Sequence, residues 1–137
     1  MSVTPHELLA AAQAIPHTDE ASRRAIINRV YYAAFQAAYD FHCSLPTPGS
    51  VGSAKGEHAQ LIASLSKPTV NSGHPTHLTS RRLGVMLNAL LTLRVKADYR
   101  PKENVSVEDM EMALFHAEHI FKQCYPPAPV KNTDPER

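Results

Sequence analysis

Apolar residues recur at steps of three and four along most of the chain, and no segment shows the sustained alternation of a half-buried strand. The two longest stripes fall in residues 19–43 and 78–98, and each predicts a long helix with one side in the core. The stripe in 19–43 is wide enough to face more than one neighbour, and its many alanines allow a close approach of backbones. The pattern therefore predicts an all-α fold.

Capping residues and helix breakers divide the chain into five helical segments. Thr4 and Pro5 are suited to begin the first helix, and Thr18 is the expected N-cap of the second. Ser106 and Asp109 have the spacing of a capping box and predict the start of the last helix. The first four predicted helices span residues 5–15, 19–43, 54–66 and 78–98.

Stretches rich in Pro, Gly and Ser predict the connections, at residues 45–56 and 66–77. We predict one domain over residues 1–125, an antiparallel four-helix bundle plus a short N-terminal helix. Residues 126–137 have too little apolar content to order themselves, which predicts a flexible C-terminal tail.

The charge balance excludes a protein held to nucleic acid by its overall charge. Lys plus Arg total 14 against 13 Asp plus Glu, so any phosphate contact has to come from a local cluster. No apolar run reaches the length of a membrane span, and the N-terminus lacks the pattern of a signal peptide. We therefore expect a soluble, cytoplasmic protein that does not bind membranes.

The cysteines and histidines give no sign of a metal or redox site. Cys43 and Cys124 lie in apolar helical surroundings without CxxC spacing, which predicts two reduced cysteines in the core. His116 and His119 flank Glu118, but a metal ion would need further ligands, so we interpret them as part of a solvated helix face. We predict no metal and no cofactor.

Polar aromatic and basic side chains interrupt the apolar pattern of the second helix. Arg29, Tyr32 and Gln36 follow one line along it, at steps of three and four. Adjacent to Tyr32 in sequence, Tyr31 belongs to the apolar stripe. A helix thus carries a polar strip beside its buried side.

The fourth helix ends in a second polar group, in which Arg94 and Asp98 are one turn apart and Tyr99 follows. An arginine among apolar residues needs a partner because an isolated buried charge is costly, and Asp98 is the nearest candidate. One interpretation is structural: the ion pair fixes how the second and fourth helices meet. The other is that the cluster lines a groove for a phosphate or a base, with arginine giving bidentate contact and tyrosine a stacking face.

Three segments in order, "SRRAIINRVYYAAFQAA", "EHAQLI" and "LRVKADYRP", resemble the small prokaryotic HEPN proteins over roughly residues 19–125. The resemblance implies an antiparallel helical bundle that forms a two-fold homodimer, with the ends of the fourth helices meeting at a cleft. Many HEPN proteins are metal-independent ribonucleases of toxin–antitoxin and other defence systems. Others are partners of minimal nucleotidyltransferases.

The chain departs from the motif of the nuclease branch, an arginine followed after four to six residues by a histidine. The corresponding positions after Arg94 hold Tyr99, Arg100 and Pro101. A phenol titrates near pH 10 and is a poor general base at neutral pH, whereas histidine titrates near neutrality. His58 in the third helix could approach Arg94 and supply the missing acid/base group, or it could be a structural histidine bonded to the fourth helix.

The sequence therefore supports two hypotheses. In the first, the chain is an RNA-directed HEPN-like protein whose candidate activity is that of a ribonuclease. It contacts phosphate through Arg94 and Arg29 and positions RNA with Tyr32 and Tyr99, while His58 moves protons. In the second, it is a non-catalytic dimeric partner of a minimal nucleotidyltransferase or a nucleotide, and the same cluster, with Asp98, is structural or binds the nucleotide.

Overall fold

The computed structural model describes residues 3–46, 48–50 and 55–127. This part of the chain is all-helical and contains no strand, as the apolar periodicity predicted. Within it, no helix is both long and apolar enough to cross a membrane. The helices are α1 (Pro5–Gln13), α2 (Glu20–Cys43), α3 (Glu57–Ser66), α4 (Pro75–Tyr99) and α5 (Val107–Cys124).

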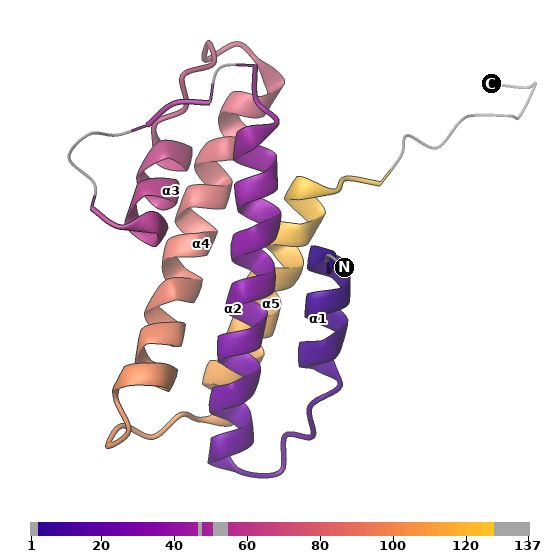
Figure 1. Cartoon of the computed structure of the whole chain (residues 1–137), viewed down its shortest axis with the longest axis vertical. Coiled ribbons are helices and arrows are strands. Elements are labelled where there is room, and N and C mark those ends of the chain that lie inside the picture. Colours follow the sequence, from indigo (N-terminus) through magenta and orange to yellow (C-terminus); the bar gives the residue numbers. More distant parts are fainter. Residues whose placement is uncertain (1–2, 47, 51–54, 128–137) are drawn as a thin grey trace, which may run out of the picture.

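Three long helices, α2, α4 and α5, run along the longest axis of the molecule and pack against one another (Figure 1). The chain ascends α2, descends α4 and ascends α5, so α4 is antiparallel to both of its long neighbours. The two short helices lie on opposite sides of this group, α1 against α2 and α3 mainly against α4. The wide apolar sector predicted for residues 19–43 is explained by this central place of α2.

Two helices begin at other residues than predicted. Asp19, not Thr18, is the N-cap of α2, because its carboxylate accepts a hydrogen bond from the backbone N–H of Ser22 at 2.8 Å. A carboxylate also complements the positive end of the helix dipole. Helix α4 begins at Pro75, three residues before the predicted start at 78, since proline suits the first turn and His74 caps it through Nδ1.

Other predictions on the connections fall partly on residues that are not described. Helix α3 begins at Glu57, and the predicted start at residue 54 lies outside the described part of the chain. The same holds for residues 128–137 of the predicted tail. The capping box predicted for Ser106 and Asp109 is confirmed, with both reciprocal hydrogen bonds present.

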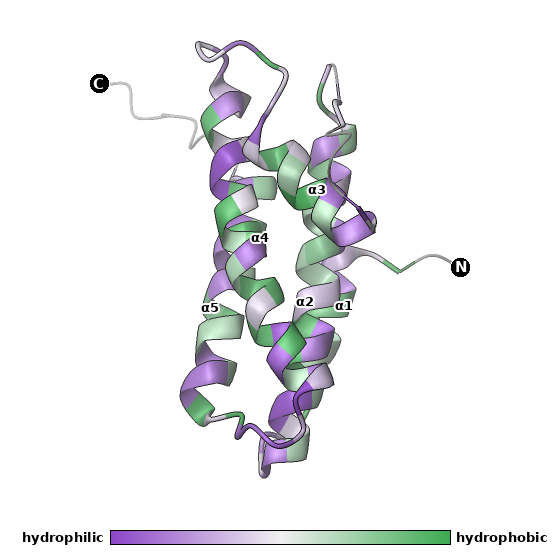
Figure 2. Ribbon diagram, turned by 90° about the vertical axis from the view of Figure 1, so that its left-hand side faces the viewer, coloured by the Kyte–Doolittle hydropathy of each residue, from purple (hydrophilic) through white to green (hydrophobic). Residues whose placement is uncertain are grey.

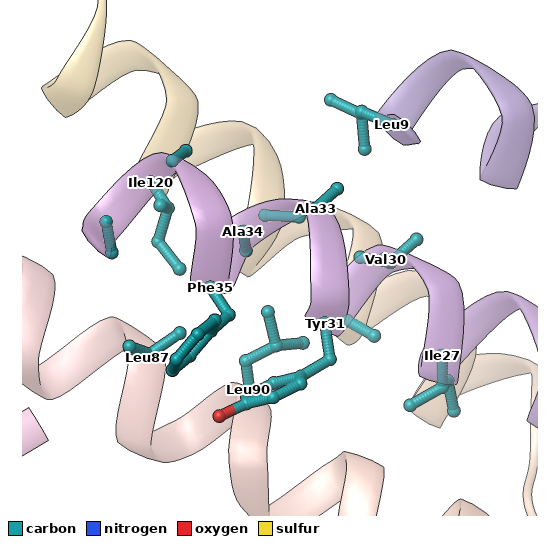
Figure 3. Close-up of a cluster of buried hydrophobic side chains, with 14 of the residues drawn as sticks. Leu9, Ile27, Val30, Tyr31, Ala33, Ala34, Phe35, Leu87, Leu90 and Ile120 are labelled. Atoms are coloured by element: carbon teal, nitrogen blue, oxygen red, sulfur yellow. The ribbon is translucent and has the colours of Figure 1, made fainter. Parts of the chain in front are cut away.

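The core lies between α2, α4 and α5, and small residues let the helices approach closely. Figure 3 shows the buried side chains of α2 packed toward Leu87 and Leu90 of α4 and Ile120 of α5. Four alanines of α2 are buried in this layer: Ala33, Ala34, Ala37 and Ala38. Most of the stability of the fold comes from this contact, because burial of apolar surface is the dominant favourable term in folding.

Helix α3 is fixed to α4 by close packing and one buried hydrogen bond. A Cβ atom at Gly84 would lie 2.6 Å from the Oγ of Ser66, so only glycine permits this approach of the helices. The buried hydroxyl of Ser80 donates to the carbonyl oxygen of Leu65 at 2.8 Å. These contacts hold α3 in the place from which His58 reaches α2.

The prediction that both cysteines are core residues is wrong for Cys43, which is exposed at the end of α2. The apolar sector of α2 does not extend around to this position. Cys124 is partly buried, and burial raises the pKa of its thiol to about 12. It therefore keeps its proton at neutral pH.

Candidate functional site

A hollow of about 400 Å³ lies between α2, α3 and α4, and three of the six predicted site residues line it: Tyr32, His58 and Arg94. We call it the polar hollow. Its size is within the usual range for ligand pockets. Its lining combines one arginine, one histidine, one carboxylate, two amides and three aromatic rings: Asn28, Tyr31, Tyr32, Phe35, Gln36, Glu57, His58 and Arg94.

Arg94 is held at the hollow by an ion pair within its own helix. Its Nε donates to Oδ2 of Asp98 at 2.8 Å, as the one-turn spacing predicted. The same oxygen accepts from Nδ2 of Asn28 on α2, also at 2.8 Å. The structural interpretation is thus supported, since Asp98 connects α2 to α4.

The ion pair leaves part of the guanidinium available. Among the described residues, the two terminal nitrogens of Arg94 have no hydrogen-bond partner, and a fifth of the side chain is exposed (20 %). The guanidinium carbon lies 5.4 Å from the ring centre of Tyr31 and 5.5 Å from that of Tyr99. Both rings hold the cation by cation–π attraction without using its N–H donors in the plane.

Tyr31 explains why α2 carries a polar aromatic residue in its buried stripe. Its side chain is 2 % exposed and packs with Leu90 (Figure 3), but its hydroxyl lies 2.8 Å from Nδ1 of His58. Burial raises the pKa of Tyr31 to about 12; the Arg94 cation opposes this rise, and Glu57 adds to it. The phenol is therefore protonated at neutral pH. It either donates to Nδ1 of His58 or accepts from Nδ1–H, depending on the tautomer of the ring.

His58 is hydrogen-bonded to Tyr31 of α2. The sequence had left open a structural histidine bonded to the fourth helix, and the bond to α2 takes the place of that one. Its ring also packs against Phe35, with 4.7 Å between the ring centres. With Nδ1 engaged by Tyr31, Nε2 is the ring nitrogen that has no partner within the described residues. The hydrogen bond thus orients the imidazole and leaves one nitrogen for a ligand.

The remaining predicted residues lie around the polar hollow. Tyr32 lines it with half of its side chain exposed, and Tyr99 is more exposed still at the end of α4. Arg29 is exposed on α2, on the strip that it shares with Tyr32 and Gln36, but it is not part of the lining. The structure brings Arg94, His58, Tyr32 and Asp98 together and leaves Arg29 outside.

The sequence did not point to Asn28 or Glu57 as site residues. Asn28 contacts a carboxylate 70 positions away, and no local pattern reveals such a pair. Glu57 stands at the first turn of α3, where a carboxylate is expected for helix stability alone. Tyr31 was expected only in the core. Its place in the apolar stripe of the helix predicts that the ring is buried, but it does not predict which residue the hydroxyl contacts.

A second arginine near the end of α4, Arg24 on α2, has a different environment. Its Nε donates to Glu20 at 3.0 Å, and its terminal nitrogens point at the last turn of α4 and the loop that follows. The guanidinium donates to five carbonyl oxygens, those of Lys96, Ala97, Arg100, Pro101 and Glu103. It satisfies carbonyls that the end of a helix leaves without intrahelical partners.

Arg23 and Glu20 extend the same structural group to the start of α5. The Nε of Arg23 donates to the carbonyl oxygen of Val105 at 2.9 Å, and the N–H of Val105 donates to Glu20 at 3.0 Å. We call Glu20, Arg23 and Arg24 the arginine bracket. These residues fix the α4–α5 connection and the last turn of α4. Arg94 lies just before this turn, so the bracket also holds the part of α4 that carries it.

Within the described residues, no three His, Cys, Asp or Glu side chains are grouped as for a metal ion. Comparison of the chain with models of protein families, with curated proteins and with solved structures found no match. The function therefore has to be argued from the site itself.

Proposed function

We propose that the chain is an HEPN-like, RNA-directed protein of a prokaryotic toxin–antitoxin or defence system, and that the polar hollow receives one nucleotide of single-stranded RNA. The observation that carries the proposal is the state of Arg94. Its guanidinium is oriented by Asp98 and two aromatic rings, yet its terminal nitrogens are unpaired in the described structure and it lines an open hollow. A fixed guanidinium with free donors suits bidentate contact with phosphate.

The exposed phenols provide the second part of the interaction. Tyr32 of α2 and Tyr99 of α4 both present large exposed rings. Stacking of bases on such rings contributes about 1–3 kcal/mol per base and tolerates any sequence. Arg29, exposed on the same strip as Tyr32, extends the contact to a neighbouring phosphate.

The same groups can cleave RNA without a metal ion. The 2′-hydroxyl attacks the adjacent phosphorus and passes its proton to Nε2 of His58, in the tautomer whose Nδ1–H donates to the hydroxyl oxygen of Tyr31. The bond from phosphorus to the 5′ oxygen breaks, and that oxygen leaves with a proton from the phenol of Tyr99. The products are a 2′,3′-cyclic phosphate and a 5′-hydroxyl, and Arg94 stabilises the charge on the phosphoryl oxygens in between.

The alternative is a non-catalytic dimeric partner of a minimal nucleotidyltransferase or of a nucleotide. It is favoured by the ion pair of Arg94 with Asp98, which offsets the charge that phosphate would need. The absence of a histidine after Arg94 at the motif spacing favours it too.

The test is incubation of the purified protein with labelled single-stranded RNA and with tRNA in EDTA, beside the variants Arg94→Ala and His58→Ala. Lys102→Ala is the matched control, since it removes one exposed positive charge near the end of α4 but does not line the hollow. Cleavage lost in both site variants and kept in the control supports a ribonuclease.

Two other outcomes separate the remaining possibilities. RNA that is bound but not cleaved, with binding weakened only by Arg94→Ala, supports an RNA-directed protein without catalysis. RNA that is neither bound nor cleaved by the wild-type protein contradicts the proposal and supports the alternative.

A further inference from the structure

The outer side of α4 and α5 exposes large apolar side chains that the fold does not use. On α4, Val85 is 70 % exposed and Leu78, seven residues earlier, shares its side. On α5, Phe115 is 53 % exposed, and Met112 precedes it by three residues. We call this surface the α4–α5 face. It includes a groove of about 610 Å³ between the upper half of α4 and the end of α5.

The α4–α5 face is separate from the polar hollow. Val85 and Arg94 are nine residues apart on α4, which is two and a half helical turns and places them on opposite sides. The groove is lined by residues of α4 and α5 such as Met86 and His119 and by Ser66 of α3, and it shares no residue with the polar hollow. One buried atom, Nδ1 of His119, has no hydrogen-bond partner among the described residues.

The two ends of the α4–α5 face carry opposite charges. Arg81 and Arg82 are exposed near the start of α4, and neither forms an ion pair within the described residues. Glu108 and Glu111 are exposed near the start of α5, also without ion pairs in this part of the chain. Because α4 and α5 are antiparallel, these pairs lie at opposite ends of the face (Figures 1 and 2).

The salt bridge between Lys96 and Asp109, with 2.8 Å between Nζ and Oδ2, gives the register of the two helices. Arg81 lies fifteen residues before Lys96, so at 1.5 Å per residue the basic end is about 22 Å from the acidic end. Val85 and Phe115 fall between them. The face thus has cations at one end, anions at the other and apolar side chains in the middle.

We propose that a second copy of the chain covers this face, related to the first by a two-fold axis across the middle of α4 and α5. Such a rotation turns one copy end over end, so that Arg81 and Arg82 meet the partner's Glu108 and Glu111 at both ends of the interface. Val85 and Phe115 then meet their own counterparts near the axis. A two-fold interface must be complementary to itself, and this distribution of charge meets that condition.

The arrangement differs from the one that the family resemblance implies, in which the ends of the fourth helices meet at a shared cleft. Here the two polar hollows face away from the interface, and each remains open to its own ligand. The inference goes beyond the proposed function and does not rest on it, since its argument uses neither Arg94 nor RNA.

The first test measures the mass of the wild-type protein and of single variants by sedimentation at micromolar concentration. We expect a dimer, and we expect Val85→Glu and Phe115→Glu to weaken it by about a hundredfold or more, because each places a charge at the centre of the interface. Tyr99→Glu is the matched control, an exposed aromatic residue away from this face, and it should leave the dimer intact. Circular dichroism confirms that each variant is folded.

A wild-type protein that is still monomeric at about 100 μM, a concentration at which even a weak dimer would form, would overturn the inference. So would a dimer that Tyr99→Glu disrupts and Phe115→Glu does not, which would favour contact between the ends of α4.

The second test exchanges the charges. The double variant Arg81→Glu/Arg82→Glu and the double variant Glu108→Arg/Glu111→Arg should each dimerise poorly, because both ends of each homodimer then carry like charges. An equal mixture of the two should form a heterodimer about as stable as the wild-type dimer, since opposite charges again meet at both ends. A mixture that stays monomeric contradicts the two-fold arrangement.

Discussion

Arg24 and Arg94 reach the same end of α4 but are satisfied in different ways. Arg24 donates to Glu20 and to five carbonyl oxygens, so its hydrogen-bonding capacity is used within the fold. Arg94 uses only Nε for a protein partner in the described structure and keeps its terminal nitrogens beside an open hollow. The difference indicates which cation maintains the fold and which can bind a ligand.

The comparison also shows why a family-like motif does not identify a site by itself. The serine–arginine start of α2 is among the most specific parts of the resemblance, yet Arg23 and Arg24 contact backbone carbonyls. Arg94 at the other end of the motif lines the hollow. Both arginines are partly buried, so burial alone does not separate them.

The largest effect expected on stability is that of Arg24→Ala. The substitution leaves several carbonyl oxygens at the end of α4 without a charged donor, and we expect a loss of about 3 kcal/mol in the free energy of unfolding. Arg94→Ala should cost no more than about 1 kcal/mol, because its ion pair is partly exposed and Asn28 still contacts Asp98. Urea denaturation of both variants measures the difference. Equal losses would contradict the distinction between the two arginines.

The next effect concerns the affinity of the hollow for RNA. In Asp98→Asn, Arg94 loses the carboxylate that competes with phosphate, while the amide can still contact α2. We expect RNA to bind up to about fivefold more tightly, corresponding to the upper range for one partly exposed ion pair. Fluorescence anisotropy measures the change, and Glu103→Gln, which removes a carboxylate paired with Arg100 outside the hollow, is the control. Weaker binding by Asp98→Asn would show that the carboxylate positions Arg94 more than it competes.

A third effect is the alkaline loss of stability caused by Tyr31. Its pKa is raised to about 12 in the folded chain from an ordinary value of 10, so folding favours the protonated phenol. This contribution is complete below about pH 10 and is lost as the pH rises through 12. Tyr31→Phe should reduce the fall of the unfolding free energy over this range, at a cost of about 1 kcal/mol at neutral pH for the hydrogen bond to His58.

Cys124 contributes to the same alkaline loss, since the pKa of its thiol is raised to about 12 from 9. The measurement is therefore made on a Cys124→Ala background, with the unfolding free energy determined between pH 9 and 12. An unchanged slope after Tyr31→Phe would mean that the phenol is not protected from solvent as the structure shows.

Most of the fold could be predicted from the sequence because its determinants are local. The apolar stripes of α2 and α4 repeat within a few turns, and the capping box at Ser106 and Asp109 spans four residues. The pair of Arg94 and Asp98 could be predicted for the same reason, as the two residues are one turn apart.

The contacts that the sequence did not reveal join residues far apart in the chain. Tyr31 and His58 come from different helices, and Arg24 reaches carbonyl oxygens more than seventy positions away. Backbone carbonyls leave no trace in the sequence, so the structural role of Arg24 had no detectable signal. The exposure of Cys43 was missed because cysteine is among the residues most often buried.

The most direct test of the account is the salt dependence of RNA binding by the wild-type protein and by Arg94→Ala, measured beside Arg24→Lys. If Arg94 contacts one phosphate of a single strand, its removal should weaken binding and reduce the slope of log affinity against log salt by about 0.7. Arg24→Lys should lower stability but leave affinity and slope unchanged. Wild-type affinity and slope in Arg94→Ala would contradict the central claim that this guanidinium holds RNA in the polar hollow.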